Sequence, residues 1–209
     1  GSCIHALIRN KAETAVTGSF EKYGHVPEPQ IEKAPEMSAL LEGIAAGKAT
    51  TQIIRENPRL AFRVNDIDTL RQTFLSEKYA EQNRAVEVQY IYGATGTGKT
   101  RGIYQRHGAH DIYRVTNYQN GKGVSFDDYH GQDVIVFEEF ASQLPIEEML
   151  NLLDVYPLML PARYSDKVAC YTKVYITSNL PLSRQYQAVQ QYHPETWKAF
   201  LRRIRTFTE

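Results

Sequence analysis

A short stretch of glycine, lysine and threonine residues has the spacing of a phosphate-binding loop. It reads Gly93-Ala94-Thr95-Gly96-Thr97-Gly98-Lys99-Thr100 and directly follows an apolar segment that favours a β-strand. Glycines let successive backbone N–H groups turn inward around a phosphate. In the pattern Gly-x-x-x-x-Gly-Lys-Thr, the lysine reaches the β- and γ-phosphates and the threonine hydroxyl binds Mg²⁺. The stretch therefore predicts a nucleoside-triphosphate site, with an ordinary glycine-rich turn as the alternative.

Two acidic residues follow a wholly apolar segment farther along the chain. The run Val134–Phe137 has the pattern of a strand buried on both faces, and Glu138 and Glu139 come directly after it. Carboxylates at such a place are costly unless a cation balances them. We interpret Glu138 as a Mg²⁺ ligand and Glu139 as the group that orients and deprotonates the attacking water. An ordinary solvated loop start is the alternative.

A third polar residue, Asn179, follows another apolar segment. Its amide can hydrogen-bond a γ-phosphate or an attacking water, although asparagine is also common in turns. In open α/β sheets, ligands bind at the carboxyl ends of the strands, and Gly93, Glu138 and Asn179 each follow such an end. We therefore expect them to converge, with the acidic pair on a strand adjacent to the one that precedes the glycine-rich loop.

Two groups of basic residues suggest contacts outside this site. The segment from Pro161 to Lys167 is predicted to be a hairpin tip, where Arg163, Tyr164 and Lys167 suit nucleic-acid phosphates and a stacked base. A solvated loop explains it about as well. Arg202 and Arg203 lie near the end of the chain, and one of them would reach the triphosphate of a neighbouring subunit as an arginine finger. The pattern does not choose between the two, and a solvated helix face is the alternative.

The elements that must position these residues change in type near Val86. Beyond it, strands alternate with helices, which predicts an α/β fold with a mainly parallel sheet. The expected strands are Val86–Tyr92, Ile112–Val115, Asp133–Phe137 and Tyr171–Thr177, and the expected helices begin at Lys99, run from Pro145 to Val155 and run from Pro194 to the end. Upstream, three short helices are expected at about residues 37–46, 50–57 and from 65 onward. Their apolar faces (Met37, Leu40, Leu41, Ile44, Ala45; Ile67, Leu70, Phe74, Leu75) form a thin core that needs a neighbour to pack on.

Composition limits the other possibilities. The chain has 209 residues, with 24 Lys and Arg against 24 Asp and Glu, so any basic surface must be local. The two cysteines, Cys3 and Cys170, are far apart, which offers no disulfide framework and suits a reducing, intracellular setting. No apolar run is long enough to span a bilayer, so no membrane partner is expected.

Taken together, these motifs resemble the superfamily three helicase domain of replication initiator (Rep) proteins. Such proteins serve small circular single-stranded DNA viruses, circoviruses among them, and related rolling-circle plasmids. The resemblance covers roughly residues 86–205 and includes three further stretches, Phe126–Gly131, Tyr156–Leu158 and Ile176–Asn179. One departure is the Glu138-Glu139 pair, because many relatives carry two aspartates there.

The segment Lys11–Gly24 resembles the part of the Rep nicking domain just after its catalytic tyrosine. Ile8 stands where that tyrosine would be, so no nicking activity is expected of this chain. The resemblance implies three parts: a linker or nicking-domain remnant (1–35), a small helical oligomerisation domain (36–82) and a P-loop, AAA+-like ATPase domain (83–209).

The resemblance further implies an ATP-dependent DNA helicase of rolling-circle replication. It would act as a homo-oligomeric ring, often a hexamer, with single-stranded DNA in a central pore and an arginine supplied in trans. Two alternatives stay open, an RNA helicase and an ATP-gated assembly module that unwinds nothing; a metabolite kinase is remote. The expected setting is the cytoplasm for a plasmid-borne protein and the nucleus for a eukaryotic virus.

Overall fold

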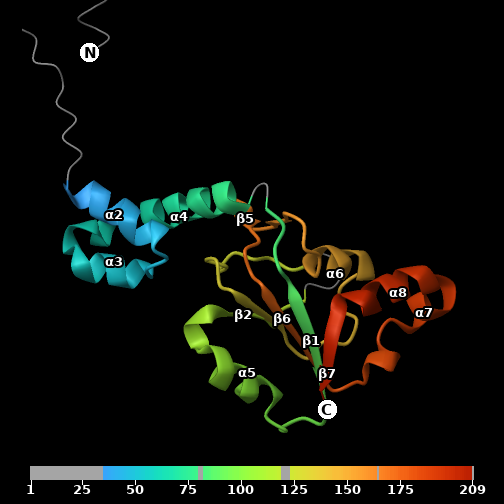
Figure 1. The fold of residues 1–209 in the computed structure, drawn as a ribbon. Helices are drawn as coiled ribbons and strands as arrows, with labels where there is room; N and C mark the ends of the chain where they lie inside the picture. The colour runs from blue at the N-terminus through green and yellow to red at the C-terminus, as the bar shows by residue number, and fades with distance from the viewer. Residues whose placement is uncertain (1–34, 80–81, 119–122, 164, 209) are drawn as a thin grey trace, which may run out of the picture. The chain divides into compact units, whose positions relative to one another are not determined.

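A computed structural model describes residues 35–79, 82–118, 123–163 and 165–208 (Figure 1). The sheet and its helices belong to one compact unit, Glu36–Glu209. Residues 1–34 of the predicted nicking-domain remnant, Lys11–Gly24 among them, lie outside the described residues. Tyr164 also lies outside them. Among the described helices, none is long and apolar enough to cross a bilayer.

Five parallel strands form the central sheet, which confirms the predicted α/β class. Their spatial order is β2 (Ile112–Val115), β3 (Val134–Phe137), β6 (Lys173–Ser178), β1 (Glu87–Tyr92) and β7 (Ile204–Thr208). The four predicted strands are present, with bounds that differ by at most two residues. The expectation that the acidic strand β3 lies beside β1 is wrong, because β6 lies between them.

The final helix was predicted to reach the end of the chain, and this is wrong. Helix α8 covers Pro194–Arg203, and the chain then enters β7, which pairs with β1. The physical reason lies in the residues after Arg203, where Ile204, Thr206, Phe207 and Thr208 are β-branched or aromatic and favour a strand.

Helices cover both faces of the sheet (Figure 1). On one face, Ile103 of α5 (Lys99–His107) packs against Val134 and Val136. On the other, Met149 and Phe200 share a core with the alternate residues Ile135 and Phe137. The helices on that side are α6 (Ile146–Leu152), α7 (Gln187–Tyr192) and α8, with short 3-10 turns η2 (Ala109–Asp111) and η3 (Leu182–Arg184) elsewhere. The apolar run of β3 is therefore buried on both sides, as predicted.

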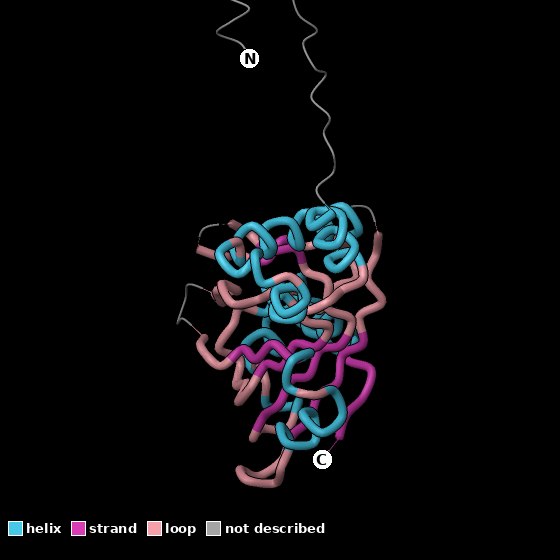
Figure 2. The backbone as a smooth tube through the Cα atoms, turned by 90° about the vertical axis from the view of Figure 1, so that its left-hand side faces the viewer, coloured by secondary structure: helices cyan, strands magenta, loops and turns pink. Residues whose placement is uncertain are grey.

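The upstream segment consists of three helices, as expected. They are α2 (Pro35–Ala45), α3 (Thr50–Glu56) and α4 (Val64–Tyr79), with the 3-10 turn η1 (Pro58–Phe62) between the last two. Figure 2 shows them gathered at one end of the layer of strands. Their own core is small, comprising Leu40, Ile44, Ile53, Leu60 and Ile67. Several predicted core residues are more than a third exposed instead: Met37, Leu41 and Phe74.

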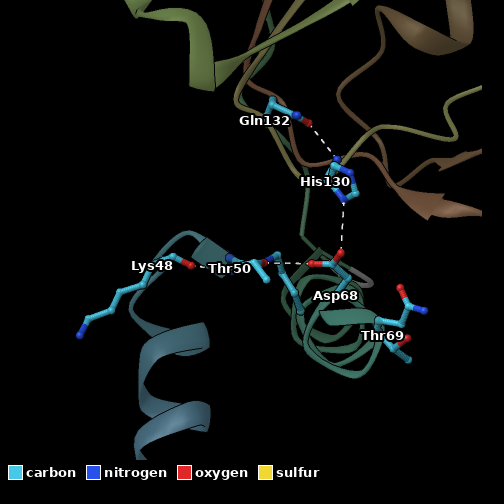
Figure 3. A network of polar contacts seen from close by, with 8 residues as sticks. Lys48, Thr50, Asp68, Thr69, His130 and Gln132 are labelled. Atoms are coloured by element: carbon cyan, nitrogen blue, oxygen red, sulfur yellow. Dashed lines mark hydrogen bonds and ion pairs between the residues drawn. The ribbon is translucent and has the colours of Figure 1, made fainter. Parts of the chain in front are cut away.

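Polar contacts attach this helical segment to the loop that precedes β3 (Figure 3). Asp68 accepts a hydrogen bond from the Thr50 hydroxyl at 3.0 Å, and its other oxygen lies 4.0 Å from Nδ1 of His130. The backbone N–H of His130 is in turn bonded to the Gln132 side chain. Leu75 packs against the main core, so the neighbour on which the thin helical core packs is part of the same chain.

Candidate nucleotide site

The glycine-rich loop joins the end of β1 to the start of α5. Gly96 and Gly98 have φ values of 84° and 86°, in the left-handed region that glycine adopts at little cost. Gly98 is the N-cap of α5, so the helix begins at Lys99, as predicted. The positive end of the helix dipole therefore lies at the loop, where it favours an anion.

Lys99 connects the loop to the neighbouring strand end. Its ammonium donates to the carbonyl oxygens of Gly93 at 2.7 Å and Ala94 at 2.9 Å, and to Oδ1 of Asn179 at 3.2 Å. Asn179 follows β6 directly, so two of the three predicted strand-end residues are in contact through this lysine. The charge of Lys99 has only neutral oxygens in these contacts, which leaves it suited to an anionic ligand.

Glu138 sits at the end of β3 with one oxygen engaged and one without a partner. Oε2 accepts a hydrogen bond from Arg114 on β2, whereas Oε1 is buried and makes no hydrogen bond to the described residues. The side chain is only 11% exposed. An unpartnered, buried carboxylate oxygen is costly unless a cation binds it. Glu138 therefore fits the role of a Mg²⁺ ligand, together with the Thr100 hydroxyl.

Arg114 was missed by the sequence analysis. It is a cation in the strand Ile112–Val115, and a charge beside buried apolar residues is the signal that could have found it. The hydrogen bond to Glu138 raises the pKa of the Arg114 guanidinium, which stays charged in any case. The positive charge of Arg114 balances part of the negative charge of Glu138.

Glu139 has a different environment from its neighbour. It is exposed, and its φ of 50° is unusual for a residue other than glycine. The bend is held by a hydrogen bond from the Gln143 side chain to its carbonyl at 2.8 Å and by the Phe140 N–H, which donates to Thr177 O at 2.8 Å. Backbone strain of this kind is frequent at functional sites, where surrounding contacts hold it in place.

These groups line one cleft of about 360 Å³. It brings together the loop, the acidic pair and the end of β6: Thr95, Gly96, Gly98, Lys99, Thr100, Arg101, Glu138, Glu139, Thr177, Ser178 and Asn179. The expected convergence at the carboxyl ends of the strands is therefore present, even though β6 separates the acids from the P-loop strand. Gly93, Ala94 and Thr97 line an adjoining hollow, which shares Gly98 and Lys99 with the cleft.

Beneath the cleft, a buried glutamine joins four segments. The Gln185 side-chain amide donates to Tyr90 Oη at 2.8 Å, Phe140 O at 3.0 Å and Ser178 Oγ at 3.1 Å, and it accepts from Ser142 at 2.6 Å. Gln185 has no exposed surface. It thereby fixes the strand before the P-loop, the turn after the acidic pair and the end of β6 relative to one another. A glutamine after η3 carries no sequence signal for this role.

The two C-terminal arginines lie away from the cleft of their own chain. Because β7 is parallel to β1 and starts opposite Val88, the end of α8 lies at the amino ends of the strands, opposite the nucleotide cleft. Arg202 is exposed, whereas Arg203 is bound to Asp154 and to the carbonyl of Ala199. The structure thus separates the two candidates by their surroundings.

The predicted hairpin is present as β4 (Met159–Leu160) and β5 (Lys167–Val168), which pair antiparallel. At its tip, Asp127 accepts a hydrogen bond from the Arg163 backbone, which lowers the pKa of that carboxyl although the group is exposed. The Arg163 side chain is 72% exposed and lies within 4.0 Å of the same aspartate. The cation is therefore paired on one side and open to solvent on the other.

Several known proteins resemble this chain in sequence. An RNA helicase family model matches residues 89–180, which span the glycine-rich loop, the acidic pair and Asn179. The chain is 30% identical over 154 residues to the replication-associated protein of Beak and feather disease virus, covering 74% of this chain and 46% of the relative. The corresponding protein of Canary circovirus is 27% identical, covering 82% of this chain and 52% of the relative.

A replication-associated protein of a human-associated cyclovirus is 24% identical over 203 residues, which is 94% of this chain and 68% of the relative. Among solved structures, the S. cerevisiae Hsp104–ADP complex matches with a TM-score of 0.41 and 18% identity, over 80% of this chain and 29% of that one. The chain spans about half the length of the first two relatives, at 46% and 52%.

Proposed function

We propose, on the premise that this chain is a relative of circovirus replication-associated proteins with a helicase domain, that it is an ATP-dependent DNA helicase of rolling-circle replication. The observation that carries the proposal is the single cleft in which Lys99, the acidic pair and Asn179 meet. A P-loop alone would fit many phosphate-binding proteins. A P-loop facing two carboxylates and a polar strand end suits hydrolysis of a triphosphate.

Each residue of the cleft has a role that follows from its surroundings. The backbone N–H groups of Gly93–Thr100 and the Lys99 ammonium would bind the ATP phosphates. Thr100 and Glu138 would hold Mg²⁺, which when bound offsets the negative charge of the phosphates. The exposed Glu139 would accept the proton of the attacking water, and Asn179 would orient that water or the γ-phosphate.

An arginine from a second copy would complete the site. The amino ends of the strands face away from the cleft of the same chain, so Arg202 can reach a triphosphate only in another copy. Arg202 suits this role better than Arg203, because the latter is already bound to Asp154. A contact between different surfaces of successive copies closes into a ring when the rotation allows it. A homo-oligomeric ring, by family likeness a hexamer, is therefore part of the proposal.

The proposed track is single-stranded DNA in the pore of that ring, contacted by Arg163 and Lys167 at the hairpin, with Tyr164 as a stacking residue. The matching family model is described as an RNA helicase, which keeps an RNA track as the second candidate. DNA is favoured because Lys11–Gly24 resembles part of the nicking domain of Rep proteins, which serve single-stranded DNA viruses. Unwinding of matched DNA and RNA forks separates the two, and a preference for RNA would reverse the choice.

The central test is DNA-stimulated ATP turnover by the wild type and by Lys99→Ala. The proposal requires turnover in the first and its loss in the second. Sedimentation with and without ATP, run beside the unwinding assay, separates a helicase from an ATP-gated assembly module. Rings that hydrolyse ATP and never part the strands would support the module and refute the helicase.

A further inference from the structure

We infer that Asp154 is a positioning residue that fixes the end of α8 and thereby presents Arg202 to a second copy of this chain. Asp154 Oδ2 lies 2.5 Å from Nη2 of Arg203, and both side chains are only 26% exposed. Arg203 also donates to the Ala199 carbonyl at 3.1 Å, within its own helix. The inference rests on the proposed function, because it concerns how one copy contributes to the ATP site of the next.

Asp154 is itself held in place from the opposite side. Its Oδ1 accepts the N–H of Val155 at 2.8 Å, and its carbonyl accepts a hydrogen bond from Nη2 of Arg84 at 2.8 Å. Arg84 is buried, and its guanidinium lies over the Tyr171 ring at 4.5 Å from the centroid. Since Arg84 lies just before β1, the anchor of α8 is tied to the strand that leads into the P-loop.

This anchor sets the direction of Arg202. Successive residues of a helix point about 100° apart, so a helix that turns Arg203 inward to Asp154 turns Arg202 to another side, where it is exposed. Beyond Arg203 the chain enters β7 without a loop. The bond to Asp154 therefore holds the last residue of the helix, directly before the first residue of the strand. Loss of the bond would free the last turn of α8 and with it the Arg202 guanidinium.

The surface beside the anchor suits a protein partner. The residues just after Asp154 include exposed apolar side chains, with Tyr156 at 62%, Met159 at 51% and Val155 at 37%. Exposed apolar and aromatic side chains next to an arginine are typical of interfaces. The nucleotide cleft of a second copy is the complementary partner of Arg202, because its acidic pair is anionic and a triphosphate bound there would add negative charge.

The first experiment measures kcat and KM for ATP, with DNA present, in wild type, Arg202→Ala, Asp154→Asn and the double variant. We expect Arg202→Ala to lower kcat by about 10³-fold or more. Asp154→Asn should lower kcat by about 10- to 100-fold, as a small misplacement of a catalytic group does, with little change in KM. The double variant should be no slower than Arg202→Ala, because Asp154 acts only through that arginine.

A matched control comes from the same edge of the sheet. Asp133 forms an ion pair with Lys173 at 2.7 Å at the amino ends of β3 and β6. Asp133→Asn removes a comparable ion pair and should leave kcat unchanged. Should Asp154→Asn fail to fold, as judged by circular dichroism, Arg203→Lys serves instead, because lysine keeps the charge and loses the guanidinium that contacts both Asp154 and the Ala199 carbonyl.

The second experiment mixes variants before assay. Lys99→Ala copies have a defective cleft and an intact Arg202, so they should restore turnover when mixed with Asp154→Asn copies, as they should with Arg202→Ala copies. A loss of structure within the Asp154→Asn cleft itself would not be rescued in this way. Rescue of Arg202→Ala without rescue of Asp154→Asn would overturn the inference and leave the proposed function standing. If Arg202→Ala keeps its full kcat, both the inference and the arginine in trans fail, while the test at Lys99 still decides ATP hydrolysis.

Discussion

The two edges of the central sheet carry opposite kinds of unmatched polar group. At the carboxyl edge, the buried Oε1 of Glu138 is an acceptor without a partner. At the amino edge, the buried atoms without a partner are donors, on the guanidinium groups of Arg84 and Arg203. Buried polar atoms of this kind are few in folded proteins, and those among the described residues all lie at these two edges.

The difference suggests what each edge is for. An acceptor that faces a cleft beside glycines in left-handed conformations suits a cation and a phosphate ligand. At the amino edge, Arg84 and Arg203 both contact Asp154, and Arg202 is exposed beside them. This excess of positive charge suits an anion brought by another molecule. The edges are complementary, so copies arranged with the amino edge of one against the carboxyl edge of the next would satisfy both.

The largest expected effect comes from the carboxyl edge. Lys99→Ala removes the ammonium that would bind the phosphates and should abolish measurable ATP turnover, a larger loss than the about 10²- to 10⁴-fold expected when a general base is removed. Lys173→Ala is the matched control, because it removes a lysine from the amino end of β6 and should leave turnover within twofold of wild type, a range of about 0.4 kcal/mol. Equal losses of ATP turnover in the two variants would contradict the assignment of ATP binding to the carboxyl edge.

Glu139→Gln should have the next largest effect. Loss of the general base is expected to lower kcat by about 10²- to 10⁴-fold. Because the amide has nearly the same shape, ATP binding should persist, which fluorescence of a labelled nucleotide can measure. Glu147→Gln, an exposed acid in α6 away from the cleft, serves as control. Unchanged kcat in Glu139→Gln would transfer the base role to another group.

The residues of the carboxyl edge were largely predictable from the sequence. The P-loop and the apolar run before Glu138 are local patterns, and each requires a particular backbone geometry that the structure shows. The order of the strands was not predictable in the same way. Hydrophobic patterns specify that β3 and β6 are buried strands, but which strand lies beside β1 depends on long-range packing.

A third prediction concerns the hydrogen bonds that join the segments under the cleft. Gln185→Ala removes the amide and leaves the Ser142 hydroxyl and the Phe140 carbonyl without this partner. We expect the free energy of unfolding to fall by about 1–3 kcal/mol, measured with urea. The exposed Gln191→Ala should change it by less than about 0.5 kcal/mol. Should Gln185→Ala be as stable as wild type, the glutamine would not hold the cleft together.

The contacts of Gln185, Arg114 and Asp154 escaped the sequence analysis for one physical reason. Apart from Ser178, seven residues from Gln185, the partners that define these roles are distant in the chain: Arg114 and Glu138 are 24 residues apart, Asp154 and Arg203 are 49 apart, and Gln185 and Tyr90 are 95 apart. A single polar residue has no periodicity, and its partner is fixed only when the strands have assembled. The wrongly predicted end of α8 has a different cause. The last residues are compatible with both an amphipathic helix and an edge strand, and pairing with β1 selects the strand.

The smallest effect is expected at the amino edge, in the pH dependence of stability. Burial opposes ionisation of Asp133, but hydrogen bonds from Lys173 and Thr172 outweigh it and lower the pKa of this carboxyl. A carboxyl whose pKa is lower in the folded chain stabilises the fold above its unfolded pKa of about 4, and the stabilisation is lost as the pH falls through the folded value. Because Asp133 is 45% exposed, solvent screening limits the contribution to about 1 kcal/mol or less. The free energies of unfolding of wild type and Asp133→Asn, measured with urea, should therefore differ slightly at pH 7. They should converge near pH 3, because the aspartate is increasingly protonated there. A difference that persists unchanged at the lower pH would mean that packing around the side chain, and not its charge, stabilises this edge.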